Sequence, residues 1–129
     1  MKMTTKILEF YKCDHCGNIV MVTHTGEGEL VCCGEPMKKL EEQTADYRTE
    51  KHVPIIEKTP KGIKVKVGSV PHPMVKEHYI QWISVKQGRN FYIHALRPGE
   101  APEAEFPVDD VDVKAMEFCN VHGIWVNRK

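Results

Sequence analysis

The run Ile63-Lys64-Val65-Lys66-Val67 decides the fold class, because apolar and charged side chains alternate along it. This period of two is typical of a β-strand with one face against a core and the other in water. Short β-type runs recur from about residue 49 onward, and no segment has the spacing of an amphipathic helix of three turns. The predicted strands are 53–57, 63–67, 79–85, 91–96, 111–118 and 124–126.

Turn residues separate these runs. Thr59-Pro60-Lys61-Gly62 has turn chemistry, and Lys86-Gln87-Gly88-Arg89-Asn90 is typical of a hairpin connection. About seven short strands with frequent turns indicate a β-sandwich. We therefore expect an all-β protein in which residues 49–129 form a seven-stranded β-sandwich.

Residues 1–40 predict a second, smaller domain. Only short β-type runs occur in it, at 7–12, 18–23 and 30–31, and large apolar residues are few. Such a segment cannot bury enough surface to fold alone, so a metal ion or a partner chain must stabilise it. The polar residues 41–48 that follow are expected to be a linker.

Charge and cysteine usage limit the possible functions. The chain has 129 residues with 18 acidic and 18 basic side chains, which gives no basic excess for a nucleic acid or a membrane surface. No apolar run approaches the ~20 residues that span a bilayer, and the N-terminus lacks the apolar core of a signal peptide. We therefore expect a cytoplasmic protein, whose five cysteines stay reduced and serve as metal ligands.

The first candidate metal site combines Cys13-Asp14-His15-Cys16 with Cys32-Cys33. Four thiolates suit zinc or a single iron in tetrahedral geometry. Adjacent cysteines point apart by default, so Cys32 and Cys33 can share one metal only with a distorted angle. A structural zinc knuckle and a strained vicinal disulfide are the alternatives. His15 is expected to be a solvated loop residue.

The second candidate site combines Cys119-Asn120-Val121-His122 with His52, His72 and His78. One thiolate and four imidazoles are too many donors for a closed structural zinc site, and they suit a redox iron that keeps one position free. The donors come from three segments, which we expect to meet at one edge of the β scaffold. His24 and His94 have no ligand partner nearby in sequence and are expected to be structural.

Glu50-Lys51 immediately precedes His52. An ammonium group near an open iron position attracts an anion and stabilises developing negative charge. A carboxylate there could ligate ferric iron. The alternative is an ordinary charged pair on a loop. A thiolate opposite the open position pushes electron density toward a bound oxygen species, which suits one-electron chemistry better than hydrolysis.

Several motifs together resemble the two-iron superoxide reductases of the desulfoferrodoxin family. The N-terminal part is similar to desulforedoxin through Tyr11–Asn18 and Leu30–Gly34. The C-terminal part is similar to the catalytic domain. Its matching stretches are Glu50–Pro54, His72–Met74, His78–Trp82 and Cys119–Gly123. The resemblance covers essentially the whole chain.

The resemblance implies two iron ions and an immunoglobulin-like catalytic sandwich. Cys13, Cys16, Cys32 and Cys33 would hold a rubredoxin-like iron. His52, His72, His78 and His122 would surround the catalytic iron in a plane, with Cys119 axial. Glu50 would take the sixth position in the ferric state, and Lys51 would attract superoxide.

The implied activity is superoxide reductase, which reduces superoxide by one electron to hydrogen peroxide and releases no dioxygen. It detoxifies superoxide, takes electrons from rubredoxin or a similar carrier, and is expected in a homodimer. A non-enzymatic iron or zinc electron-transfer module is the alternative, and a dismutase is a third possibility.

Overall fold

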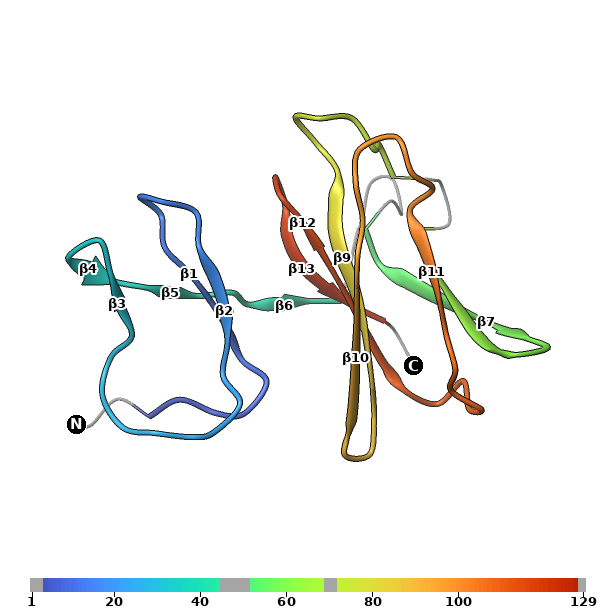
Figure 1. Ribbon diagram of the computed structural model, residues 1–129, viewed down its shortest axis with the longest axis horizontal. Helices are drawn as coiled ribbons and strands as arrows, with labels where there is room; N and C mark the ends of the chain where they lie inside the picture. The colour runs from blue at the N-terminus through green and yellow to red at the C-terminus, as the bar shows by residue number, and fades with distance from the viewer. Residues whose placement is uncertain (1–3, 45–51, 69–71, 128–129) are drawn as a thin grey trace. The chain divides into compact units, whose positions relative to one another are not determined.

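The computed structural model describes residues 4–44, 52–68 and 72–127, and all regular structure in them is β (Figure 1). No helix that could cross a membrane occurs among these residues. The chain divides into two compact units, Met1–Glu41 and Glu42–Lys129. The predicted all-β fold class is therefore confirmed.

The N-terminal unit consists of two small antiparallel sheets. Strands β2 (Ile19–Met21), β1 (Phe10–Lys12) and β5 (Lys38–Lys39) form one sheet in that order, and β3 (Val31–Cys32) pairs with β4 (Glu35–Pro36). Its buried apolar side chains in the described part are few: Phe10, Cys13 and Val22. So small a core gives little hydrophobic stabilisation, as the composition predicted.

The C-terminal unit is a sandwich of two sheets. The five-stranded sheet has the order β10-β9-β12-β13-β6, and the three-stranded sheet has the order β11-β8-β7. The strands are β6 (Glu42–Gln43), β7 (Pro54–Thr59), β8 (Gly62–Val67), β9 (Ile80–Gln87), β10 (Asn90–Ala95), β11 (Glu103–Phe106), β12 (Lys114–Cys119) and β13 (Gly123–Val126). Strands β7 to β13 give the seven-stranded count that was expected, although only six of them correspond to predicted runs, and β6 adds an eighth strand by pairing in parallel with β13.

The core between the two sheets confirms the alternation in β8. Ile63, Val65 and Val67 are at most 1% exposed and pack in one apolar cluster with residues of β9, β11 and β12. Lys64 and Lys66 lie between them in sequence, where they form ion pairs with Glu103 and Glu57. Strand β8 thus gives one face to the core and the other to charged side chains at the surface.

Four features of the sandwich differ from the prediction. Gln87 pairs with Asn90, so the β9–β10 connection is a two-residue turn rather than five residues long. Strand β12 begins at Lys114, later than predicted, and β11 was missed. The polar run expected to be a linker contains β6, whose Gln43 side chain donates to the carbonyl oxygens of His122 and Ile124.

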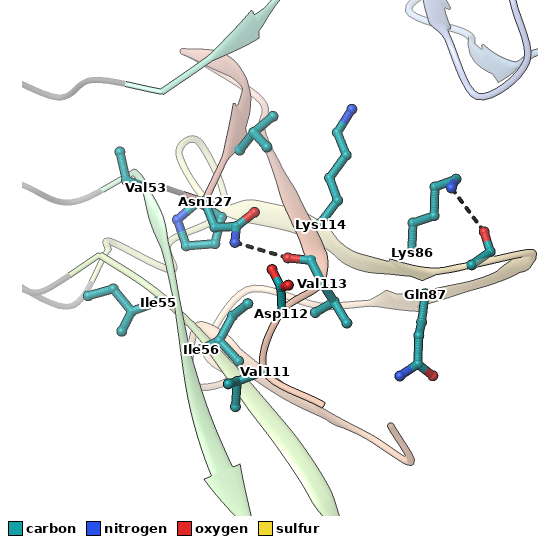
Figure 2. A pocket seen from close by; sticks show the side chains of 13 residues that line it. Val53, Ile55, Ile56, Lys86, Gln87, Val111, Asp112, Val113, Lys114 and Asn127 are labelled. Atoms are coloured by element: carbon teal, nitrogen blue, oxygen red, sulfur yellow. Dashed lines mark hydrogen bonds between the residues drawn. The ribbon is translucent and has the colours of Figure 1, made fainter. Parts of the chain in front are cut away.

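A surface pocket of the sandwich lies beside the start of β7 and the β9–β10 turn (Figure 2). Ile55, Ile56 and Val111 give it an apolar wall, and Lys86 and Lys114 contribute basic side chains. None of the nine predicted metal ligands lines this pocket. The candidate chemistry of the sandwich is therefore located elsewhere.

Candidate metal centres

The four N-terminal cysteines converge on one point. Cys13 directly follows β1, Cys16 lies in the turn after it, Cys32 ends β3, and Cys33 lies in the turn before β4. All four sulfur atoms lie within 4.8 Å of one another. All are free thiols, so the vicinal disulfide alternative was wrong.

An unusual backbone conformation brings the two adjacent cysteines to the same point. Cys33 has a φ of +54°, in the left-handed region that residues with a side chain rarely adopt. The two sulfur atoms consequently lie 4.0 Å apart. The default divergence of neighbouring side chains is overcome by local backbone strain.

The pKa values of the thiols in this cluster differ because of their hydrogen bonds. The Cys16 amide donates to the sulfur of Cys13 and lowers the Cys13 pKa to about 6. Interactions with Cys16 and the other sulfurs raise the Cys33 pKa to about 12. The two pKa values move in opposite directions because Cys13 accepts a hydrogen bond from a backbone amide, whereas Cys33 interacts with neighbouring sulfurs. A metal ion bound to all four sulfurs would hold them as thiolates.

His15 lies outside this cluster, as expected. Its Nε2 atom lies 2.8 Å from a carboxylate oxygen of Glu35, and its side chain is half exposed. His24 and His94 are exposed and belong to neither ligand group in the described part of the chain. Exposed side chains give no evidence for the structural role that was expected of these two histidines.

The second group is assembled by three segments of the sandwich. His52 precedes β7, His72 and His78 lie in the connection between β8 and β9, and Cys119 and His122 flank the turn between β12 and β13. Their five ligand atoms lie within 4.8 Å of one another. The predicted convergence from three segments is confirmed.

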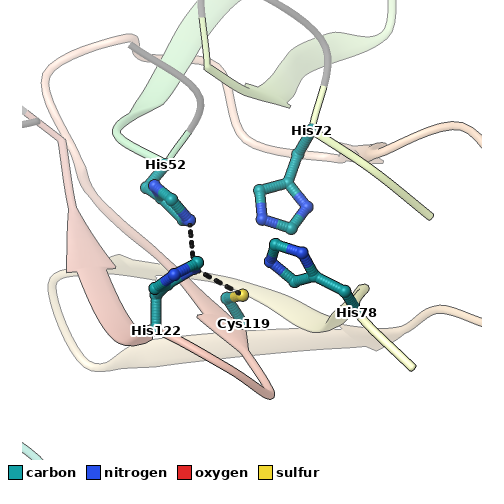
Figure 3. Close-up of side chains that lie close together, drawn as sticks. All are labelled: His52, His72, His78, Cys119 and His122. Carbon is teal, nitrogen blue, oxygen red and sulfur yellow. Dashed lines mark hydrogen bonds between the residues drawn. The ribbon is translucent and has the colours of Figure 1, made fainter. Parts of the chain in front are cut away.

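The four imidazoles form a closed ring of neighbours (Figure 3). Successive ring centroids, in the order His52, His72, His78, His122 and back to His52, are 4.8, 4.7, 5.0 and 4.6 Å apart. Adjacent rings stand edge to face, at 67° to 85°. The sulfur of Cys119 lies 3.8 Å from His122 Nδ1.

The nitrogen atoms that face the centre can be assigned from their neighbours. His72 Nδ1 lies 2.7 Å from the carbonyl oxygen of Pro73, so its Nε2 is the atom left for a metal. That Nε2 is buried and makes no hydrogen bond. His52 Nε2 and His122 Nδ1 lie only 3.0 Å apart. A metal ion at the centre fits this set, because it satisfies the buried Nε2 atom of His72.

Burial also favours the ligand forms of these residues. It lowers the pKa of His72 to about 4, so this imidazole is neutral at pH 7 and can bind a metal. Burial raises the pKa of Cys119, against hydrogen bonds from the His122 and Val121 amides that lower it. A thiolate in this buried place therefore requires a neighbouring cation.

Three further residues support the ligands, and Gly123 was already expected from the sequence to close the turn of Cys119 and His122. Trp125 stacks on the His52 ring at a centroid distance of 4.7 Å and 19° between planes. Gly123 has a φ of +90°, which lets the turn of Asn120 to His122 close. Asn120 bonds to both neighbours of His78. No periodicity or ligand spacing marks Asn120 or Trp125, so only coordinates could identify their contacts.

Glu50 and Lys51 lie outside the described residues. His52 itself is described and is 8% exposed. The roles predicted for Glu50 and Lys51 therefore stay predictions.

The fold and the two groups define a class of protein, an all-β metalloprotein with a four-thiolate site and a site of four imidazoles and one thiolate. Comparison with known families narrows this class. The desulfoferrodoxin N-terminal domain matches residues 5–40, and the desulfoferrodoxin family matches residues 44–128. This chain belongs to the desulfoferrodoxin family, and its two groups fit two iron centres.

Individual relatives agree over most of the chain. Desulfoferrodoxin of Nitratidesulfovibrio vulgaris is 57% identical over 117 residues, which cover 91% of this chain and 93% of the relative. Desulfoferrodoxin of Syntrophotalea carbinolica is 57% identical over 118 residues, 92% of this chain and 94% of the relative. The crystal structure of the superoxide reductase from Treponema pallidum superposes with a TM-score of 0.74 at 32% identity, covering 94% of this chain and 98% of that one.

Proposed function

We propose that this chain is a superoxide reductase. It converts one superoxide, one electron and two protons into one hydrogen peroxide, and no dioxygen is released. Iron bound by the five C-terminal donors supplies the electron and is reduced again by an external donor. The Treponema pallidum protein whose structure the chain resembles over 94% of its length is a superoxide reductase.

One observation carries this proposal: a buried sulfur and four imidazoles form an incomplete donor set. Cys119 is fully buried, whereas His122 is exposed. These five donors would hold an iron ion and would leave a six-coordinate iron one position short, so that a small anion could bind there. Neutral imidazoles would support the ferrous state, and the thiolate would add electron density to the metal.

The residues that precede His52 complete the proposed site. Lys51 would draw superoxide toward the iron by its positive charge and would stabilise the negative charge that grows on the superoxide oxygens during reduction. Glu50 would serve as a further ligand of ferric iron. Water supplies the two protons that hydrogen peroxide needs.

The N-terminal cysteines hold the second iron in a rubredoxin-like centre. Their four sulfur atoms, within 4.8 Å of one another, match the tetrahedral site that four thiolates build. This iron stabilises a unit with very few buried apolar side chains. We take the domain bounds to be 1–40 and 49–129, with residues 41–48 between them.

We place the protein in the cytoplasm as a homodimer that detoxifies superoxide. Rubredoxin or a similar one-electron carrier returns the iron to the ferrous state. A reductase suits a cell that avoids dioxygen, because a dismutase would release it. These assignments rest on the reduced cysteines and the family resemblance.

The yields per superoxide consumed test the activity. With an excess of electron donor, a reductase forms one hydrogen peroxide per superoxide and no dioxygen. A dismutase forms one hydrogen peroxide and one dioxygen per two superoxide ions. An electron-transfer module consumes little superoxide, so either of these outcomes would contradict the proposal.

A further inference from the structure

Asn120 ties the turn that carries Cys119 to the loop that carries His78. The backbone amide of Asn120 donates to the Tyr79 carbonyl at 3.3 Å, and the backbone amide of Tyr79 donates to the side-chain Oδ1 of Asn120 at 2.9 Å. Its Nδ2 donates to the Glu77 carbonyl at 3.1 Å. The side chain thus continues the β9–β12 ladder past the irregularity between Phe118 and Cys119.

These bonds hold the residues on both sides of His78. The backbone of His78 is itself fixed, because its amide donates to Val75 O at 3.0 Å and its carbonyl accepts from the Val75 amide at 3.1 Å. Glu77, His78 and Tyr79 are therefore anchored in succession. Since Asn120 directly follows Cys119, a single side chain fixes one ligand loop against the other.

Asn127 makes the same pattern of three hydrogen bonds as Asn120, but it does so around a residue that belongs to neither candidate metal site. Its backbone amide donates to Ala115 O at 3.0 Å, and the Ala115 amide donates to its Oδ1 at 2.9 Å. Its Nδ2 donates to Val113 O at 3.0 Å, as Figure 2 shows. The residue between these two anchors is Lys114, on the exposed side of β12. The chain therefore contains a matched pair of asparagine clamps, one of which encloses a candidate metal ligand.

We propose that Asn120 is a positioning residue that sets the placement of His78 relative to Cys119. Through this placement it controls how tightly the C-terminal centre holds iron and how the thiolate meets the metal. Residues that orient metal ligands typically change metal affinity about 10- to 100-fold when they are replaced. The inference rests on the iron centre and not on the identity of the substrate.

The test compares N120D with N127D in the full-length, iron-loaded protein. Each aspartate keeps an acceptor for the backbone amide but loses the Nδ2 donor and faces a carbonyl oxygen instead, so the structural loss is the same at both places. Three quantities are measured: the rate at which a chelator removes ferrous iron from the C-terminal centre, the position of its thiolate-to-ferric absorption band, and the thermal midpoint.

N120D should lose iron about tenfold faster and shift the band, whereas N127D should change iron loss less than twofold and leave the band in place. Both should lower the thermal midpoint similarly. Equal rates of iron loss in the two variants, or an unchanged rate in N120D, would overturn the proposal. If the aspartate variants do not fold, N120S and N127S give the same comparison with the same two outcomes.

A double-mutant cycle separates positioning from general stabilisation. In a His78→Ala background, N120D should change iron loss less than twofold, because the ligand that Asn120 positions is gone. A tenfold effect that persists there would contradict the proposal. No superoxide is used in these measurements, so a failure here and a failure of the reductase assay are distinguishable.

Discussion

Cys119 is the residue on which the chemistry of the C-terminal centre depends. It is fully buried at the end of β12, and burial raises the pKa of its thiol. A metal ion is the cation that can keep it ionised there. The thiolate is also the one soft, anionic donor among four neutral imidazoles, so it should dominate the spectrum of the oxidised centre.

Replacing this sulfur should therefore remove one spectral feature and leave another. Cys119→Ser should abolish the thiolate-to-ferric absorption band of the C-terminal centre, because serine oxygen cannot give that transition. The bands of the four-thiolate centre should survive and serve as the internal control. Visible spectra of the oxidised protein check this, and a C-terminal band that persists would show that another ligand produces it.

Lys51 should act by long-range attraction as well as by contact. Lys51→Ala should slow the second-order reaction with superoxide about tenfold at low ionic strength. The difference from wild type should shrink at high salt, since the screening length falls to about 3 Å at 1 M. Pulse radiolysis over a range of salt concentrations measures both quantities.

Lys61 offers a control with the same change of charge. It lies in the turn after β7, the six-residue strand that follows His52 and Val53, so it is about 20 Å farther along the chain. Lys61→Ala should leave the low-salt rate within about twofold. A Lys51→Ala loss that does not depend on salt would contradict the steering role.

Glu50 should matter after the first encounter rather than during it. Glu50→Ala should keep the rate of superoxide capture within about twofold and change the absorption spectrum of the ferric centre, because the sixth ligand is replaced by solvent. Stopped-flow spectra of the oxidised variant check this. An unchanged ferric spectrum would show that Glu50 is not a ligand.

Among the elements, the turn between β7 and β8 limits the sandwich sterically. A methyl group on Gly62 would collide with the carbonyl oxygen of Phe106, which is backbone and cannot move aside cheaply. Gly62→Ala should therefore destabilise the sandwich by more than about 3 kcal/mol. Urea unfolding of the iron-loaded protein measures the loss.

The turn between β9 and β10 provides the comparison. Gly88 has a φ of +58°, but an added methyl group there meets nothing within 4 Å. Gly88→Ala should cost only the backbone strain, about 1–2 kcal/mol. Equal losses for Gly62→Ala and Gly88→Ala would contradict the steric argument.

Sequence patterns predicted the strands with a strong apolar signal and missed those in which this signal is weak or absent. The strand β8 was predicted because Ile63, Val65 and Val67 face the core at a period of two. In β11, Glu103-Ala104-Glu105-Phe106 alternates as well, but its small Ala104 gives a weak apolar signal. The two-residue strand β6 is polar, and only its pairing with β13 makes it a strand.

In the candidate site, too, some residues have a clear sequence signal and others have none. Cysteine and histidine are common metal ligands, so residue type together with the family resemblance predicted all nine members of the two candidate groups, and each group converges in the structure. Asn120 acts through hydrogen bonds to backbone groups, and Trp125 acts through ring stacking. Such contacts depend on which loops meet in space, and residue type alone does not reveal them.

On the scale of the whole molecule, the two units depend on metal to different degrees. The sandwich has a large apolar core made by strands of both sheets, whereas the N-terminal unit buries few apolar side chains. Cys13→Ser should therefore unfold or loosen the N-terminal unit and leave the peroxide yield of the sandwich within about twofold. Amide NMR spectra and the superoxide assay check the two halves of this prediction.

Loss of activity in that variant would show that the four-thiolate centre takes part in turnover. The corresponding change in the other unit, Cys119→Ser, should do the opposite and leave the N-terminal resonances in place. A variant of either kind that disturbs both units equally would contradict this division between a metal-stabilised unit and a sandwich with its own core.

The most direct test of the central claim is a crystal structure of the iron-loaded protein with anomalous data at the iron edge. The account predicts one iron bonded to four imidazoles, from His52, His72, His78 and His122, and to the sulfur of Cys119. The position opposite the sulfur should hold solvent or a carboxylate. An iron bound by fewer of these five residues, or a closed tetrahedral zinc in its place, would contradict the account.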